Sequence, residues 1–170
     1  MHLEESEIVL TRSNIVIKKM LQRNETPKAG SILDWKPIDQ SVDFLDEHFD
    51  NSYGGFGTGM KFPEPMNYEI LLRTWKRKAD QRSMEILDKS LTKMSKGGIY
   101  DQIGGGFSRY SVDDSWKTPH FEKMLYDNGQ LVSLYAEAYL KFKDSLYKEV
   151  VFETLEFVER ELTAENGAFY

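Results

Sequence analysis

A glycine-aromatic element that occurs three times constrains the fold of this chain more than any other feature. The copies are Gly54-Gly55-Phe56-Gly57, Gly104-Gly105-Gly106-Phe107 and Gly167-Ala168-Phe169. They lie roughly 50 to 60 residues apart, about the length of a helical hairpin with its two connections. Repeated hairpins bury their apolar faces on their neighbours, so we expect an all-α fold of about two and a half hairpins. Because the sequence stops where a further loop begins, we interpret it as a fragment.

Helical periodicity in the remaining sequence supports this fold class. Apolar residues recur at helical spacing within residues 4–22, 37–49, 80–96, 118–142 and 144–162, and in a helix that begins near residue 67. Thr118-Pro119 and Asp144 are typical starts for the last two helices. The polar segment 24–30 indicates a linker. We therefore divide the chain into an N-terminal helix with its linker, 1–30, and a domain of helical hairpins, 31–170.

Composition excludes several classes of function. The chain has 22 Lys and Arg against 28 Asp and Glu, a net charge of −6, and no long basic run. We therefore expect neither nucleic acid nor a membrane as a partner. The absence of cysteine excludes disulfides, thiolate metal ligands and cysteine nucleophiles. With neither a signal peptide nor a run of ~18 apolar residues, we expect a soluble, cytoplasmic protein.

The first glycine-rich loop, residues 51–66, does not match a phosphate-binding loop. Such a loop needs GxxxxGK[ST] between a strand and a helix, whereas here Gly59 is followed by Met60 and Lys61 after a helical segment. One interpretation places Phe56 and Lys61 at the mouth of a pocket. The alternative is a packed connector without a ligand.

The second long loop, residues 97–117, is rich in aromatic and charged residues. Residues 107–112 have the composition of a strand and Asp113-Asp114 that of a turn, so we expect a small β-hairpin here. Tyr110 and Trp116 offer flat surfaces for a sugar ring, while Asp101 and Arg109 offer hydrogen bonds to hydroxyl groups. This pattern favours a carbohydrate-like small molecule. The alternative is that the aromatic residues form the loop's own core.

A helix over 118–142 would place His120, Lys123 and Asp127 on one stripe, with Glu122 about 200° from His120. His120 would then be a general acid or base near the start of a helix, or alternatively a capping histidine. Because His120 and Glu122 face apart and no clustered ligand set occurs, we expect no metal. A catalytic carboxylate pair is also conceivable, but the sequence leaves its members open. The candidates are Asp101, Asp113, Asp114, Glu122 and Asp127.

The run from Gly97 to Asp113, followed by Trp116 and the segment Pro119-His-Phe-Glu-Lys-Met-Leu-Tyr-Asp-Asn128, resembles a known family. This is the family of thioredoxin-domain-containing proteins that includes spermatogenesis-associated protein 20. Gly54-Gly-Phe-Gly57 with Lys61-Phe-Pro63 matches it as well, and the resemblance covers roughly residues 38–170. It implies an (α/α)6 toroid similar to six-hairpin glycosidases and N-acylglucosamine 2-epimerases. By this resemblance the chain is an incomplete toroid, without the thioredoxin-like domain.

In such toroids the starts of the inner helices and the loops before them line a central pocket. The resemblance therefore implies an epimerase- or glycosidase-like parent that needs no cofactor, while the chain alone is expected to be inactive. The expected catalytic residues are His120, Asp101 and Glu122, and the expected substrate-binding residues are Arg109, Tyr110, Trp116, Lys123, Asp127, Lys61 and Phe56. The alternative is a non-catalytic scaffold, with Arg109 and His120 buried in saturated networks. Further expected partners are the rest of the parent chain and a second copy, through exposed inner-helix faces.

Overall fold

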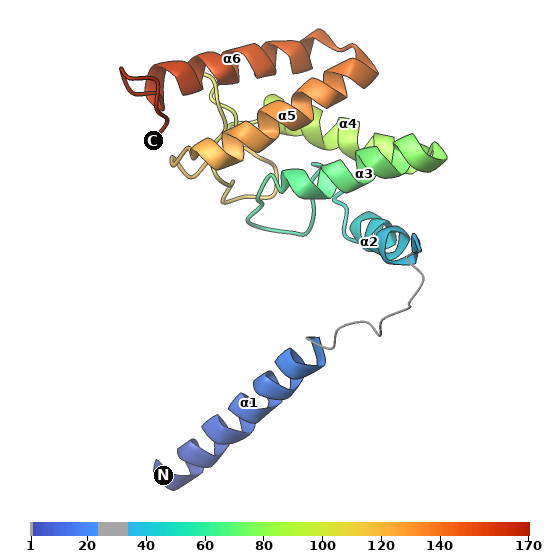
Figure 1. Cartoon of the computed structure of the whole chain (residues 1–170), viewed down its shortest axis with the longest axis vertical. Coiled ribbons are helices and arrows are strands. Elements are labelled where there is room, and N and C mark those ends of the chain that lie inside the picture. Colours follow the sequence, from blue (N-terminus) through green and yellow to red (C-terminus); the bar gives the residue numbers. More distant parts are fainter. Residues whose placement is uncertain (1, 24–33) are drawn as a thin grey trace. The chain divides into compact units, whose positions relative to one another are not determined.

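The computed structural model describes the backbone of residues 2–23 and 34–170 and the side chains of residues 9–21 and 34–170. The chain forms two units, Met1–Asp34 and Trp35–Tyr170. In the first unit, helix α1 runs over His2–Arg23 (Figure 1). The linker expected at 24–30 lies outside the described residues. Within the described parts, no helix is long and apolar enough to cross a membrane.

The second unit is built from helical hairpins (Figure 1). Its helices are α2 (Lys36–Glu47), α3 (Pro65–Lys78), α4 (Gln81–Ser95), α5 (Leu125–Phe142) and α6 (Ser145–Glu161). Helix α3 packs against α4, α5 packs against α6, and the hairpins meet through α3 with α5 and α4 with α6. Helices α3 and α5 therefore form one layer and α4 and α6 the other. Helix α2 packs beside α3 and α4.

Both hairpins turn in the same way. Ala79 after α3 and Lys143 after α5 adopt left-handed backbone conformations, with φ of 56° and 57°. The next residue is an aspartate in each case: Asp80 accepts from the amide of Ser83 at 3.0 Å, and Asp144 accepts from the amide of Leu146 at 3.0 Å. An aspartate at this position stabilises a helix start by about 1 kcal/mol. The expected cap at Asp144 is confirmed.

The core lies between the two layers of helices. Leu71 of α3, Leu91 of α4 and Leu134 of α5 have no exposed surface. Tyr135 of α5 is equally buried and donates its hydroxyl to the Leu91 carbonyl at 2.8 Å. Each such side chain contributes roughly 1.5–3 kcal/mol through removal of its apolar surface from water. This packing fixes the long loops that precede α3 and α5.

The expected helix start at Thr118-Pro119 is wrong. Helix α5 begins at Leu125, and residues 118–122 pair instead with 109–112. The amide of Arg109 donates to the Glu122 carbonyl at 2.8 Å, and the amide of His120 donates to the Tyr110 carbonyl at 2.9 Å. This is the expected β-hairpin, formed by antiparallel backbone pairing around a turn, with isolated bridges in place of regular strands. His120 therefore does not lie on a helical stripe with Lys123 and Asp127.

Candidate functional site

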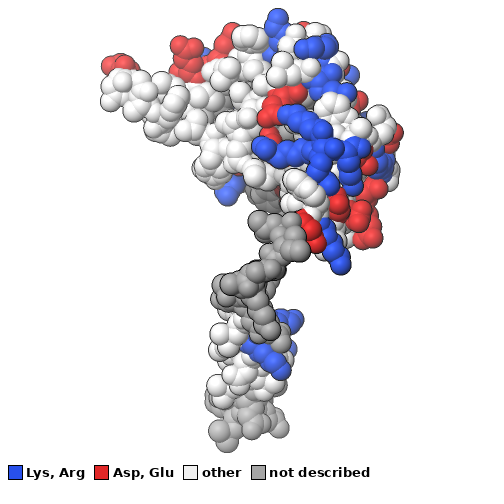
Figure 2. Space-filling model, turned by 45° about the vertical axis from the view of Figure 1, so that its right-hand side comes forward, with Lys and Arg blue, Asp and Glu red and all other residues white. Residues whose placement is uncertain are grey.

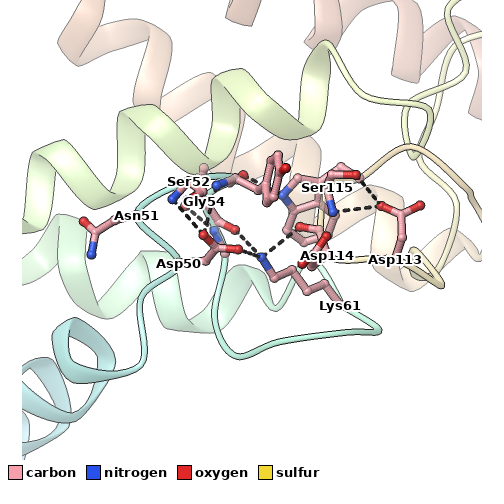
Figure 3. A network of polar contacts seen from close by, with 12 residues as sticks. Asp50, Asn51, Ser52, Gly54, Lys61, Asp113, Asp114 and Ser115 are labelled. Carbon is pink, nitrogen blue, oxygen red and sulfur yellow. Dashed lines mark hydrogen bonds and ion pairs between the residues drawn. The ribbon is translucent and has the colours of Figure 1, made fainter.

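The first glycine-rich loop is organised around a buried lysine. Lys61 is 1% exposed, and its Nζ contacts the Asp50 carboxylate and the carbonyls of Gly54 and Asp114, both at 2.9 Å (Figure 3). Its Nζ also lies 5.8 Å from the centre of the Trp116 ring. All three donors of this ammonium are thus used within the protein. The geometry favours a packed connector over the ligand contact expected of Lys61.

The second glycine-rich loop repeats this arrangement with Lys123. Its Nζ donates to the Asp101 carboxylate at 2.7 Å and to the Gly105 carbonyl at 2.8 Å, and it lies 4.4 Å from the centre of the Phe157 ring. The amide of Gly104, the ammonium of Lys123 and the amide of Ile103 hold the pKa of Asp101 well below its usual range. A carboxylate that stays ionised cannot donate a proton near neutral pH. The geometry therefore favours a structural role for Asp101.

These two loops are copies of one motif. An aromatic residue and an aspartate precede the glycines in both, as Phe49-Asp50 and Tyr100-Asp101. Gly54 and Gly105 have φ of 72° and 71°, and a Cβ on Gly105 would lie 2.3 Å from the carbonyl oxygen of Glu153 in α6. Sequence reasoning missed Asp50. The signal that could have found it is a pattern shared by residues 49–56 and 100–107: an aromatic residue, an aspartate, any three residues and then Gly-Gly-Phe.

Two aromatic residues expected to bind substrate pack against the core. Trp116 has no exposed surface and donates its indole N–H to the Tyr53 carbonyl at 3.0 Å. Phe56 packs on Tyr68 with ring centres 5.3 Å apart, against the hydrophobic core. The burial of Trp116 matches the alternative in which the second loop supplies its own aromatic core. Phe56 is only partly buried and also lines a groove between α2 and α3.

The turn of the hairpin is held by Asp113. Burial raises the pKa of this carboxyl, but hydrogen bonds from the amide of Lys117, from Thr118 and from Ser115 outweigh it and hold the pKa well below its usual range. The carboxylate accepts from the amide of Thr118 at 2.6 Å and from the hydroxyl of Ser115 at 2.9 Å. Asp113 is therefore a structural residue that closes the turn.

A group of partly exposed aromatic side chains lies on the hairpin and the loop before α3. The rings of Tyr110 and His120 stack with centres 4.6 Å apart and planes 15° apart. Phe62, from the loop before α3, continues this stack at 4.9 Å from Tyr110 and is 42% exposed. Nδ1 of His120 is buried and has no hydrogen-bond partner within the described structure. We call Phe62, Tyr110 and His120 the aromatic platform.

Charged residues lie beside this platform. Arg109 and Glu122 form an ion pair at 3.4 Å, and their side chains are 43% and 45% exposed. Asp127 lies in the first turn of α5. Burial raises the pKa of Asp127; the positive charge of Arg109 opposes this shift and the negative charge of Glu122 adds to it. Oδ2 of Asp127 is buried without a hydrogen-bond partner among the described residues.

The arrangement brings together two carboxyl groups, those of Glu122 and Asp127, and the guanidinium of Arg109. Paired carboxyl groups of this kind serve as acid and base in sugar chemistry. Of the expected site residues, the structure gathers Arg109, Tyr110, His120, Glu122 and Asp127 at this partly exposed surface. It places Lys61, Asp101, Trp116 and Lys123 in the supporting structure, and Phe56 at the wall of a separate groove. Across the described residues, no group of three or more His, Asp or Glu side chains could hold a metal ion.

Two grooves adjoin the helix starts. One, of about 300 Å³, lies between α3 and α5 and is lined by Pro65, Met66, Glu69, Ile70, Arg73, Gln130, Ser133 and Glu137. A larger groove of about 680 Å³ lies between α2 and α3 and is mostly apolar, with Phe44, Leu45 and Phe56 among its walls. The larger groove contains none of the paired charges described above. On the face shown in Figure 2, basic side chains are bordered by acidic ones, so neither sign dominates.

The sequence is related to one segment of longer proteins. No family model matches the chain. Over 130 residues, 74% of this chain, it is 40% identical to spermatogenesis-associated protein 20 of Homo sapiens. It is also 36% identical over 128 residues to an uncharacterized protein of Caenorhabditis elegans. The chain spans 16% of the length of the human protein. The resemblance to the family that includes spermatogenesis-associated protein 20 is thus confirmed.

Solved structures identify the fold. The cellobiose 2-epimerase from Spirochaeta thermophila DSM 6192 is similar with a TM-score of 0.66 and 18% identity, over 79% of this chain and 38% of that chain. A family 76 glycoside hydrolase from a bovine Bacteroides thetaiotaomicron strain is similar with a TM-score of 0.62 and 16% identity, over 76% of this chain and 31% of that chain. The expected α/α toroid class is confirmed.

Proposed function

From its relationship to spermatogenesis-associated protein 20 and from its α/α toroid fold, we propose that this chain supplies a carbohydrate-binding wall of a carbohydrate-active toroid. The observation that carries the proposal is the partly exposed aromatic platform beside the Arg109–Glu122 ion pair and Asp127. Aromatic faces stack on the apolar face of a sugar ring, and charged groups at its edge bind the hydroxyl groups. Tyr110, His120 and the ion pair lie on the hairpin, Asp127 lies in the first turn of α5, and Phe62 comes from the loop before α3.

The carboxyl groups support a division of roles in proton transfer. Asp127, whose pKa burial raises, is suited to hold a proton and deliver it to a sugar oxygen. Glu122, paired with Arg109, is suited to accept a proton or to stabilise developing positive charge. His120 completes the platform through its stacking on Tyr110. The proposed chemistry is acid–base catalysis on a saccharide, as in an epimerase or a glycoside hydrolase.

The scaffold alternative predicts a different environment for the same residues. It requires Arg109 and His120 to be buried in saturated networks. The side chain of Arg109 is 43% exposed, and Nδ1 of His120 has no partner within the described residues. These observations favour the carbohydrate-binding proposal over the scaffold. Lys61 and Lys123 are instead the residues that are bound within polar networks, in the two glycine-rich loops next to the site.

Calorimetric titration of the 170-residue chain with cellobiose and a panel of neutral and anionic disaccharides tests the proposal. Because the chain covers 38% of the similar epimerase, binding rather than turnover is measured. Tyr110→Ala should weaken binding about tenfold, which corresponds to about 1.4 kcal/mol. Phe152→Ala removes a 56% exposed aromatic ring from α6 and should leave affinity unchanged. The proposal is refuted if Tyr110→Ala and Phe152→Ala bind the sugar with equal affinity. It is also refuted if the folded wild type binds no sugar of the panel.

A further inference from the structure

The start of α5 is attached to the second glycine-rich loop at two points. Lys123, just before the helix, donates to the Asp101 carboxylate and the Gly105 carbonyl at 2.7 and 2.8 Å. Asn128, in the first turn and fully buried, accepts from the amide of Phe107 at 2.7 Å and donates to its carbonyl at 3.1 Å. The segment from Lys123 to Asn128 is therefore fixed against one loop.

Along the sequence, this attachment lies between the two residues of the candidate site that carry carboxyl groups. Glu122 precedes Lys123 directly, and its carbonyl accepts from the amide of Arg109 at 2.8 Å. Asp127 follows four residues after Lys123, within α5. Glu122 is held by the backbone pairing of the hairpin, and Asp127 is held by helix α5. Lys123 therefore lies in the sequence between the two residues that carry these carboxyl groups.

The first glycine-rich loop uses the same device on another part of the site. Lys61 is bound to Asp50 and Gly54 and pairs through its backbone with Ser111, at 2.9 and 2.8 Å. The next residue, Phe62, stacks on Tyr110. In both copies a lysine that is bound to the Asp-Gly-Gly loop immediately adjoins a residue of the candidate site. Phe62 follows Lys61, whereas Glu122 precedes Lys123, so the shared feature is a loop-bound lysine next to a site residue.

We propose that Lys123 is a positioning residue for the candidate site, which through Asp101 and the Gly105 carbonyl sets the separation of Glu122 and Asp127. The sugar-binding part of this inference rests on the proposed function. Two of the three donors of the Lys123 ammonium are used by Asp101 and Gly105. Its effect is transmitted through the backbone of Glu122 and the first turn of α5.

Two variants separate positioning from folding. Lys123→Met removes the charge and keeps the length of the side chain. Asp101→Asn keeps an oxygen that can accept from the amides of Ile103 and Gly104 but removes the ion pair. Lys141→Met is the matched control, because Lys141 Nζ lies 3.9 Å from the centre of the Trp75 ring, near the end of α5, far along the helix from the site. Circular dichroism selects the variants that remain folded.

Three readouts are measured on the folded full-length variants: amide hydrogen exchange of Arg109, the NMR titration of the Asp127 carboxyl, and cellobiose affinity. In Lys123→Met and Asp101→Asn, exchange at Arg109 should accelerate at least tenfold and the Asp127 titration should move toward that of an ordinary aspartate. Affinity should fall about tenfold, while Lys141→Met should change none of the three. The inference is wrong if both Lys123→Met and Asp101→Asn keep the exchange rate of the Arg109 amide and the Asp127 titration of the wild type. If exchange and titration respond while the wild type binds no sugar, the positioning of the carboxyl groups stands and the proposed function fails.

Discussion

Substitution of Asp50 by alanine removes the partner of the most deeply buried charge in the described structure. The Lys61 side chain is 0% exposed and that of Asp50 is 15% exposed. Removing one member of a buried ion pair costs about 3–5 kcal/mol, because the remaining charge stays buried. Asp50 also accepts from the amides of Ser52 and Tyr53 at 2.7 and 3.0 Å, which adds about 1 kcal/mol. We expect Asp50→Ala to lower the free energy of unfolding by roughly 4–6 kcal/mol.

Urea unfolding followed by circular dichroism measures this loss. Glu137→Ala is the control, because Glu137 pairs with Lys76 at 2.7 Å while the two side chains are 34% and 55% exposed. An exposed pair of this kind contributes less than about 1 kcal/mol. Lys61→Met should destabilise less than Asp50→Ala, since it removes the buried charge and leaves a partly exposed carboxylate. An Asp50→Ala variant as stable as Glu137→Ala would refute the reasoning.

Further substitutions test backbone strain and proton linkage. Gly105→Ala should destabilise by roughly 2–5 kcal/mol in urea, because its φ is 71° and its Cβ would meet the Glu153 carbonyl. Gly129→Ala, with nothing within 4 Å in α5, should instead stabilise by about 1 kcal/mol. The folded pKa of Asp113 lies below its unfolded value near 3.9, so its contribution is present above that pH and lost as pH falls through the folded value. Asp113→Asn should therefore lower Tm at pH 7 and change Tm little at pH values below the folded pKa of Asp113. The pKa of Asp127 is raised, so its contribution is present below about pH 3.9 and lost as pH rises through the folded value. Asp127→Asn should therefore raise Tm at pH 7 and leave it nearly unchanged at pH 3.

The repeat of helical hairpins could be predicted from the sequence because its signals are local. Helical spacing of apolar residues, the aspartate cap at Asp144 and the recurring glycine-aromatic loops each depend on a few neighbouring residues. The start of α5 could not be predicted in the same way. Thr118-Pro119 is a good local helix start, but backbone pairing with 109–112 keeps this segment extended until Leu125. A long-range contact thus outweighed a local preference.

The candidate site was predictable in part for a related reason. Charged and aromatic residues in a glycine-rich loop have the same sequence pattern whether they face a ligand or satisfy the loop's own backbone. Lys61 and Trp116 proved to be buried, with their polar groups bound to carbonyl oxygens. Arg109 and Tyr110 lie on the hairpin, and both are partly exposed. Only the three-dimensional positions of the loops separate these two groups.

Mapping of cellobiose binding by amide chemical shifts of the full chain tests the central claim most directly. The proposed site predicts the largest changes in residues 109–112 and 118–127, with loss of these changes in Tyr110→Ala. Changes confined to the groove between α2 and α3, where Phe44 and Leu45 form the walls, would place the ligand elsewhere. That result, or the absence of changes in a folded wild-type chain, would contradict the assignment of the carbohydrate site to the hairpin.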